Sequence, residues 1–473
     1  MVLDSPLKDI ARALRQGRIS TRALTDAAVA RHELLGNRLN AYRTFAAERA
    51  LERADEADRA FAAGSDLGPL QGIPISVKDL FGVSGLPTYA GTPRRLPSQW
   101  EREGALVSRI GEQMGVIVGK THTVEFALGG LGTNQHYGSP LNPWDAHDQR
   151  ISGGSSSGAG VSLLEGSAVV AIGSDTTGSV RMPASFTGTV GLMVSHGRWS
   201  TDGIVPVAPI LDAPGILTRT VADLVLAFLA LDGRSARTWN EDAAEFESRP
   251  LNGSRIGIPR TLFWDDCSEG VAEGVETAIA EIEKAGAKLV PVEMPEPAAV
   301  YEMFQSGHIG TAAVYGMIRG EFSEWWDTLD PNVRDRLERH GASLPAYEYV
   351  GRLRRVEGWM RAADAVLADI DAIAFPSVSV TPARLADIAT ADAYRAHNLA
   401  ASRNSAVAAL LGVTALSLPV ALDKAGMPVG LQLAARHGSD PDLIALALSC
   451  ERVLGTRGQR LGEPPLLAKY APA

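Results

Sequence analysis

Cysteine is scarce in this sequence, since only Cys267 and Cys450 occur among 473 residues. They form no CxxC pair and no cluster with histidine at the spacing of a zinc site. A disulfide framework and a structural metal are therefore excluded, and a reduced, cytoplasmic environment is the simpler prediction. We expect the protein to work with no metal and no cofactor.

Runs of basic residues and long apolar runs are also missing. The net charge is −10, and Lys and Arg form no stripe of the kind that neutralises phosphates. The longest apolar stretch, residues 406–422, is interrupted by Gly412 and Pro419 and falls short of a membrane span. We expect a small molecule as the partner, with no nucleic acid and no membrane, and a homodimer as the candidate assembly.

Most of the chain alternates short apolar runs with helical periodicity, which predicts an α/β sheet covered by helices on both faces. Residues 1–65 carry the pattern of a helical lead-in. The region from about 230 to 365 is variable, and its second half has the pattern of a helical cap rich in aromatics. Strand patterns return near the C-terminus, so we expect residues 1–473 to form one domain.

The stretch ISGGSSSGAG, residues 151–160, has little side-chain bulk and could be a tether, a structural turn or a site. It lies at a loop-to-helix junction inside the α/β pattern, which argues against a tether. GSSSG matches the GxSxG nucleophile elbow at Ser156, but a polar loop precedes it where that elbow needs a strand. A phosphate loop also fails, because Met114 stands where GxxxxGK[ST] requires glycine.

A second small-residue cluster, GSDTTGSVRMPASFTG at 173–188, has the pattern of a strand, a tight turn and a helix. Ser179 falls at the start of that helix. Consecutive backbone N–H groups at such a turn form a preorganised site for an oxyanion. A base that could activate Ser179 is missing from the local pattern.

The chain resembles the amidase signature family in blocks that follow the family's order. They include GIPISVKDLF at 72–81, VGKTHTVEFALGG at 118–130, SGGSSSGAG at 152–160, GSDTTGSVRMPASFTGTVGL at 173–192 and DGIVPVAPILDAPGILTRTVADL at 202–224. The resemblance covers roughly residues 70–470. It implies the amidase signature fold, a large mixed β-sheet core with helices on both faces and a helical insertion.

The resemblance places the family's catalytic lysine on Lys78, its bridging serine on Ser155 and its nucleophile on Ser179. It also implies a cis peptide bond between Gly154 and Ser155. A lysine ammonium has no lone pair, so Lys78 must be neutral, which burial in an apolar pocket favours. A Ser/His arrangement using His122, His136 or His196 is the disfavoured alternative.

Further site residues follow from the same resemblance. The oxyanion is expected on the backbone N–H groups of Thr176, Thr177, Gly178 and Ser179, with Thr177 in place of the family's usual glycine. Gly154, Asp175 and Arg181 are expected to support the turn. Substrate is expected along the backbone of Ala127, Gly129 and Gly130, where the family has an amide-facing strand. The aromatic residues Phe304, Trp325 and Trp326 belong either to the pocket or to the core.

These assignments imply an amidohydrolase that cleaves the C–N bond of a small carboxamide or hydrazide through an acyl-enzyme on Ser179. One alternative is the glutamine-hydrolysing A subunit of a tRNA-dependent amidotransferase, which shares the catalytic trio. Another is a catalytically inactive binding protein with the amidase fold. At position 414 this chain has threonine where the family frequently has proline. This difference concerns the identity of the substrate and does not affect the catalytic trio.

Overall fold

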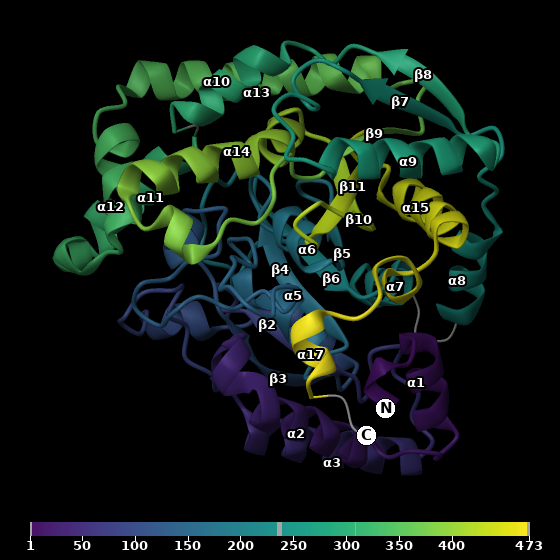
Figure 1. Cartoon of the computed structure of the whole chain (residues 1–473). Helices are drawn as coiled ribbons and strands as arrows, with labels where there is room; N and C mark the ends of the chain where they lie inside the picture. Colours follow the sequence, from purple (N-terminus) through teal and green to yellow (C-terminus); the bar gives the residue numbers. More distant parts are fainter. Residues whose placement is uncertain (1, 234–238, 308, 471–473) are drawn as a thin grey trace.

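One mixed β-sheet runs through the computed structural model, which describes residues 2–233, 239–307 and 309–470 (Figure 1). Within these residues the sheet has 11 strands in the order β1-β3-β2-β4-β6-β5-β10-β11-β9-β7-β8. The strands are β1 (Tyr42–Phe45), β2 (Pro74–Lys78), β3 (Val116–Thr121), β4 (Val170–Asp175), β5 (Val190–Met193), β6 (Ala213–Thr218), β7 (Arg255–Pro259), β8 (Lys288–Val292), β9 (Ala372–Pro376), β10 (Thr414–Leu422) and β11 (Pro428–Ala435).

The sheet combines parallel and antiparallel pairs. Strand β2 is parallel to both β3 and β4, and β7 is parallel to β8 and β9. The central strands β4, β6, β5, β10 and β11 pair in antiparallel fashion. The large mixed sheet expected from the sequence is thereby confirmed.

Helices connect and cover the strands. They are α1 (Leu7–Arg15), α2 (Thr21–Leu39), α3 (Ala47–Ala62), α4 (Ala105–Glu112), α5 (Ser157–Glu165), α6 (Arg181–Thr187), α7 (Val221–Leu231), α8 (Trp239–Ser248), α9 (Val271–Lys284), α10 (Pro297–Gln305), α11 (Gly310–Glu321), α12 (Pro331–Arg336), α13 (Ala346–Val366), α14 (Ala391–Leu410), α15 (Asp440–Leu454), α16 (Arg457–Leu461) and α17 (Pro465–Ala468). None of the helices in the described ranges is both long and apolar enough to cross a membrane.

The prediction of an entirely helical lead-in over residues 1–65 is wrong at β1, which pairs with the edge of β3. Helix α2 ends because Asn40 adopts a left-handed conformation with φ of 52°. The chain then extends, and the rings of Tyr42 and Phe45 pack against His32 of α2. Tertiary packing of two aromatic side chains therefore overrides the helical character of the flanking residues.

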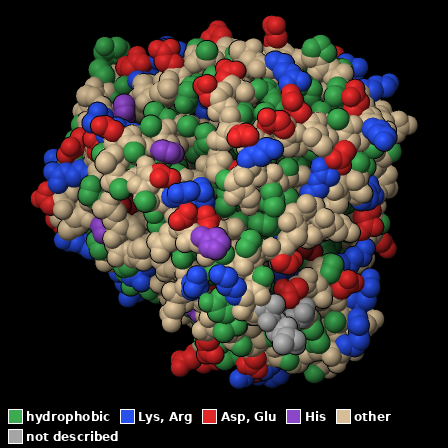
Figure 2. All heavy atoms as spheres, in the orientation of Figure 1, with side chains coloured by type: hydrophobic (Ala, Val, Ile, Leu, Met, Phe, Trp, Pro, Cys, Tyr) green, Lys and Arg blue, Asp and Glu red, His purple; other side chains and the backbone are tan. Residues whose placement is uncertain are grey.

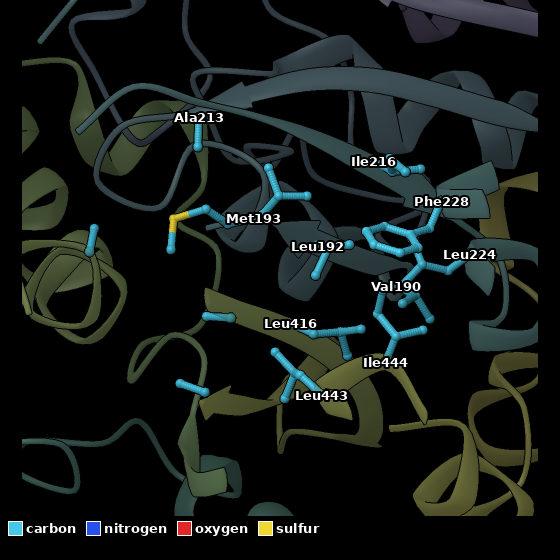
Figure 3. Close-up of a cluster of buried hydrophobic side chains, with 14 of the residues drawn as sticks. Val190, Leu192, Met193, Ala213, Ile216, Leu224, Phe228, Leu416, Leu443 and Ile444 are labelled. Atoms are coloured by element: carbon cyan, nitrogen blue, oxygen red, sulfur yellow. The ribbon is translucent and has the colours of Figure 1, made fainter. Parts of the chain in front are cut away.

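The core lies between the sheet and the helices on either face. Helices α5 and α6 pack against each other and against the central strands. Helices α7 and α15 pack against one another and cover β5, β6 and β10, as the close-up in Figure 3 shows. There Val190, Leu192, Ile216, Phe228, Leu416 and Ile444 are fully buried.

Helices α10 to α13 form a cap beyond α14, at the top and left of Figure 1. Helices α10 and α13 both contact α14, which in turn packs on α6. Helix α14 thus joins the cap to the sheet layer.

The face of the molecule drawn in Figure 2 carries acidic and basic side chains interspersed, without a large patch of one sign.

Candidate active site

Parallel pairing brings two polar side chains to one edge of the sheet. Lys78 is the last residue of β2 and Asp175 the last residue of β4, and these strands are adjacent and parallel. The carboxyl ends of parallel neighbours meet at the same edge, which is where α/β proteins place their sites. The segments around Ser155 and Ser179 reach this same edge.

The Lys78 side chain is fully buried and hydrogen-bonded to two serines. Its Nζ lies 2.7 Å from Ser155 Oγ and 3.0 Å from Ser174 Oγ. Burial lowers the pKa of Lys78 from its ordinary value of 10.5 to about 7, against the opposing effect of the Asp175 and Asp212 carboxylates. At neutral pH a large share of the amine is therefore uncharged and able to accept a proton.

Ser155 is held in place by the backbone around it. The Gly154–Ser155 peptide bond is cis, as the family resemblance implied. Ser155 O accepts from Val124 N at 3.1 Å, and Gly154 N donates to Gly130 O at 2.8 Å. The completely buried hydroxyl thus faces Lys78 in a position set by the segment around 124–130.

Ser179 lies beside this pair, at the turn between β4 and α6. Its carbonyl oxygen accepts from Ser156 N at 3.1 Å, so the backbones of the two serine segments are joined directly. The residue is 6% exposed. Among the described residues, no hydrogen bond joins the Ser179 and Ser155 hydroxyls, so the Ser179 hydroxyl is not yet engaged with its neighbour.

An ion pair between Asp175 and Arg181 supports the turn. Both side chains are fully buried, and the guanidinium donates to both carboxylate oxygens at 3.0 Å. The same carboxylate accepts from Gly178 N at 2.6 Å and from Val180 N at 3.0 Å. Burial alone would raise the pKa of Asp175, but Arg181 and these N–H groups hold it below its ordinary value. The geometry agrees with the expected supporting role.

The expected set of four oxyanion donors needs one correction. Gly178 N donates to Asp175, so this N–H is already occupied and turned toward the carboxylate. In the described part of the chain, the N–H groups of Thr176, Thr177 and Ser179 have no acceptor. Three donors of the turn are therefore available to a ligand, and Gly178 serves the turn itself through its φ of 122°.

Sequence reasoning missed two polar residues of the site, Ser174 and Asp212. Ser174 contacts the Lys78 amine, and Asp212 accepts from Thr176 Oγ1 at 2.6 Å and from the N–H groups of Val207 and Ala208 at 2.9 Å. The signal for Ser174 was its place directly before Asp175 at the end of an apolar strand. Asp212 had no such signal, because the loop that carries it is 36 residues away from Thr176.

The segment around Ala127, Gly129 and Gly130 is a turn and not the strand that the resemblance implied. Phe126 and Ala127 both adopt left-handed conformations, with φ of 46° and 56°, which bend the chain. Gly130 N donates to Asn398 Oδ1 of α14 at 2.7 Å. The Gly130 N–H is therefore occupied by a side chain of the protein itself. Ala127 is half-buried.

The three candidate pocket aromatics separate in space. Phe304 lines a cavity between the cap and α14. Trp325 is buried against Phe322, with ring centroids 4.7 Å apart, and Trp326 packs edge-on against Tyr315. Of these three aromatic residues, Phe304 thus borders the cavity and the two tryptophans pack within the cap.

The three histidines near the family motifs form hydrogen bonds with residues other than the two serines. His122 Nε2 pairs with Asn40 Oδ1 at 3.1 Å, His136 with Glu125 at 3.1 Å and His196 with Pro209 O at 2.8 Å. Burial, with a contribution from Arg43, lowers the pKa of His122 to about 4. In the described structure none of the three histidine rings is hydrogen-bonded to Ser155 or Ser179, which argues against a Ser/His arrangement.

Comparison with known proteins agrees with this geometry. The profile of the family described as Amidase matches residues 23–444. The 2-amino-5-chloromuconic acid deaminase of Comamonas testosteroni is 43% identical over 97% of this chain and 98% of its own. The A subunit of the glutamyl-tRNA(Gln) amidotransferase of Prochlorococcus marinus (strain MIT 9313) is 33% identical, over 93% of this chain and 95% of its own.

A solved amidase structure superposes with a TM-score of 0.82 at 29% identity, covering 95% of this chain and all of the other. The fold, the geometry of the site and the sequence similarity therefore indicate the same family. The chain belongs to the amidase family and is a hydrolase that acts on amide carbon–nitrogen bonds.

Proposed function

We propose that Lys78, Ser155 and Ser179 hydrolyse the C–N bond of a small acyl-nitrogen compound through an acyl-enzyme. The observation that carries this proposal is the 2.7 Å hydrogen bond between the buried Lys78 amine and Ser155 Oγ. An amine with a pKa of about 7 is matched to proton transfer at neutral pH. The intact contact also argues against an inactive binding protein.

In the acylation step, Ser179 Oγ attacks the substrate carbonyl carbon. Ser155 accepts the Ser179 proton while passing its own to Lys78, so a single positive charge appears on the amine. This transfer requires the two hydroxyls, which share no hydrogen bond in the described structure, to come into contact when substrate binds, as catalytic hydrogen bonds often form only in the complex. The reverse transfer delivers the proton to the leaving nitrogen as the C–N bond breaks.

The negative charge of the tetrahedral intermediate falls on the carbonyl oxygen. We assign its stabilisation to the N–H groups of Thr176, Thr177 and Ser179. A missing donor of this kind costs about 3–4 kcal/mol of transition-state stabilisation. Water, activated by the same relay, then attacks the acyl carbon and releases the acid from Ser179.

The similar proteins reduce the range of candidate substrates. The higher identity to the deaminase, 43% against 33%, favours a function like that of the deaminase over that of an amidotransferase subunit. That relative is named for a substrate that is an amino-substituted acid. We therefore propose small amides and hydrazides as the main class, with amino-substituted unsaturated dicarboxylic acids included among the compounds to be tested.

The test is a hydrolysis panel with the purified protein, combined with labelling by a fluorophosphonate. We expect release of amine or ammonia, and covalent labelling at Ser179. The Ser179→Ala variant should lose both. Ser156→Ala is the matched control, because Ser156 is the centre of the GSSSG motif and its hydroxyl donates to Ser174 O at 3.3 Å. Hydrolysis that survives Ser179→Ala would remove the proposal.

The amidotransferase alternative has its own readout. A component that works only inside a complex should hydrolyse the panel feebly when purified and should retain a stable partner in a pull-down. Strong hydrolysis by the isolated chain, with no partner retained, is the outcome that we expect.

A further inference from the structure

A small cavity lies between the cap and the N-terminal half of α14. Its volume is about 60 Å³. One water molecule requires roughly 10–15 Å³ of such space, so the cavity has room for a compact group of a few heavy atoms, such as a carboxylate. The walls include Leu128, Phe304, Asn332, Tyr394 and Asn398, and charged side chains from α12 and the residues after it.

The charged residues of this cavity are mostly basic. Arg336, Arg339 and Arg395 line it together with a single carboxylate, Asp335. Asp335 accepts from Arg339 at 2.8 Å and from Arg395 at 3.1 Å. Arg395 also pairs with the exposed carboxylate of Asp392, which does not belong to the lining. The lining itself therefore carries more positive than negative charge.

Further contacts place a positively charged side chain near the apolar wall. Arg336 is half-buried, donates from Nε to Thr311 Oγ1 at 3.2 Å and lies 6.0 Å from the Phe304 ring. Burial, then the charges of Arg336 and Arg339, lower the pKa of His340 below its ordinary value. The two arginines therefore add to the effect of burial on the pKa of this neighbouring histidine.

Helix α14 connects this cavity to the catalytic turn. Asn398 lines the cavity and accepts from Gly130 N, and Gly130 O in turn accepts from Gly154 N, next to Ser155. Farther along the helix, Ser405 packs against Gly178 of the turn. Ser405 follows Asn398 by seven positions, which corresponds to about 10 Å along the helix axis.

We propose that this cavity binds a carboxylate of the substrate and that the enzyme prefers acyl-nitrogen compounds carrying such a group remote from the scissile bond. The proposal rests on the proposed function above. A guanidinium binds a carboxylate through two parallel hydrogen bonds, and a positively charged lining favours an anion over a neutral group of the same size. The carboxylic acid in the name of the deaminase relative is consistent with this class.

The test compares monoamides of linear dicarboxylic acids, four to eight carbons long, with their methyl esters. We expect kcat/KM for the preferred acid to exceed that of its ester at least tenfold. The Arg336→Met variant should reduce this acid-to-ester ratio at least tenfold, and Arg336→Lys should restore part of it. Arg334→Met is the matched control, because Arg334 pairs with Asp327 and Glu338 outside the cavity.

A second measurement needs no variant. The free dicarboxylate of the preferred length should inhibit hydrolysis competitively, and its dimethyl ester should not. Equal kcat/KM for acids and esters in the unmodified enzyme would overturn the carboxylate site while leaving the proposed function in place. Failure to hydrolyse any monoamide or ester would instead count against the proposed function itself.

Discussion

At the scale of single residues, the proposed chemistry depends on an amine that is buried without a carboxylate in contact. Lys78 hydrogen-bonds only to serine oxygens in the described structure, and the Asp175 carboxylate is engaged by Arg181. A direct carboxylate partner would stabilise the ammonium and raise the pKa of Lys78. The Asp175–Arg181 ion pair therefore engages the Asp175 carboxylate away from Lys78, the proposed base.

The pH dependence of kcat/KM should report this amine. Below pH 7 the ammonium form dominates and has no lone pair, so kcat/KM should fall about tenfold for each pH unit in that range. Above pH 7 it should level off, since the pKa of Lys78 is about 7. A profile measured from pH 5.5 to 9 checks this. An acid limb centred near pH 10 would mean that Lys78 is charged in the free enzyme.

Gly178 is a second residue whose substitution has a defined outcome. Its φ of 122° disfavours any side chain, and an added Cβ would lie 2.6 Å from Ser405 Cβ. Gly178→Ala should therefore displace the turn and lower kcat about 100-fold or more, the loss typical of a misplaced oxyanion donor. Gly316→Ala, in α11 with nothing within 4 Å of the added carbon, is the control for kcat and thermal stability. Unchanged kcat in Gly178→Ala would contradict the role of Gly178 in holding the turn that carries the oxyanion donors.

At the scale of elements, buried side chains fix where helices begin. The N-terminus of α7 is held by Glu451 of α15, which accepts from Val221 N at 2.8 Å and from Ala222 N at 3.4 Å. Similarly, Thr414 at the start of β10 donates to Asp440 Oδ1 at 2.9 Å, next to the start of α15. Proline, frequent in the family at position 414, could not make that bond, which accounts for the departure structurally.

The Glu451 contact predicts a pH-dependent stability. Burial raises the pKa of Glu451 from 4.5 to about 7. The folded state thus binds the Glu451 proton more tightly than the unfolded state does. Protonation of Glu451 therefore stabilises the folded state fully below pH 4.5, and this contribution is lost as the pH rises through 7. Urea unfolding at pH 4.5 and 8 should reveal a loss of about 3 kcal/mol that Glu451→Gln does not show.

The control for this measurement is Glu283→Gln, at an exposed position of α9. It should keep the pH dependence of the unmodified protein. The same loss of stability in Glu451→Gln as in the unmodified protein would show that Glu451 is not its source.

Among the elements, those with apolar β-branched runs could be predicted from sequence, including β2, β3, β4 and β7. Strand β1 could not, because YRTF lies between long helices and its pairing with β3 involves residues far away in the chain. The proposed catalytic trio comes from motif resemblance. The occupied Gly178 N–H, Asp212 and the arginine-lined cavity could not be predicted, since each depends on where distant segments meet.

At the scale of the whole molecule, one chain brings Lys78, Ser155 and Ser179 together from three separate segments. Specific activity should therefore stay constant on dilution from micromolar to nanomolar concentration, whether or not the protein forms the homodimer considered above. Activity assays across this range, paired with light scattering, check the point. Activity that falls in step with dissociation would show that a second copy completes the site.

The path of the chain through the sheet has a consequence for biosynthesis. Helix α6, which begins two residues after Ser179, packs on β10 and β11, which lie much later in the sequence, within residues 414–435. A nascent polypeptide still lacking these strands has its nucleophile segment without the support on which the turn rests. Hydrolytic competence should thus arise only after residues 414–435 have been synthesised and have joined the sheet.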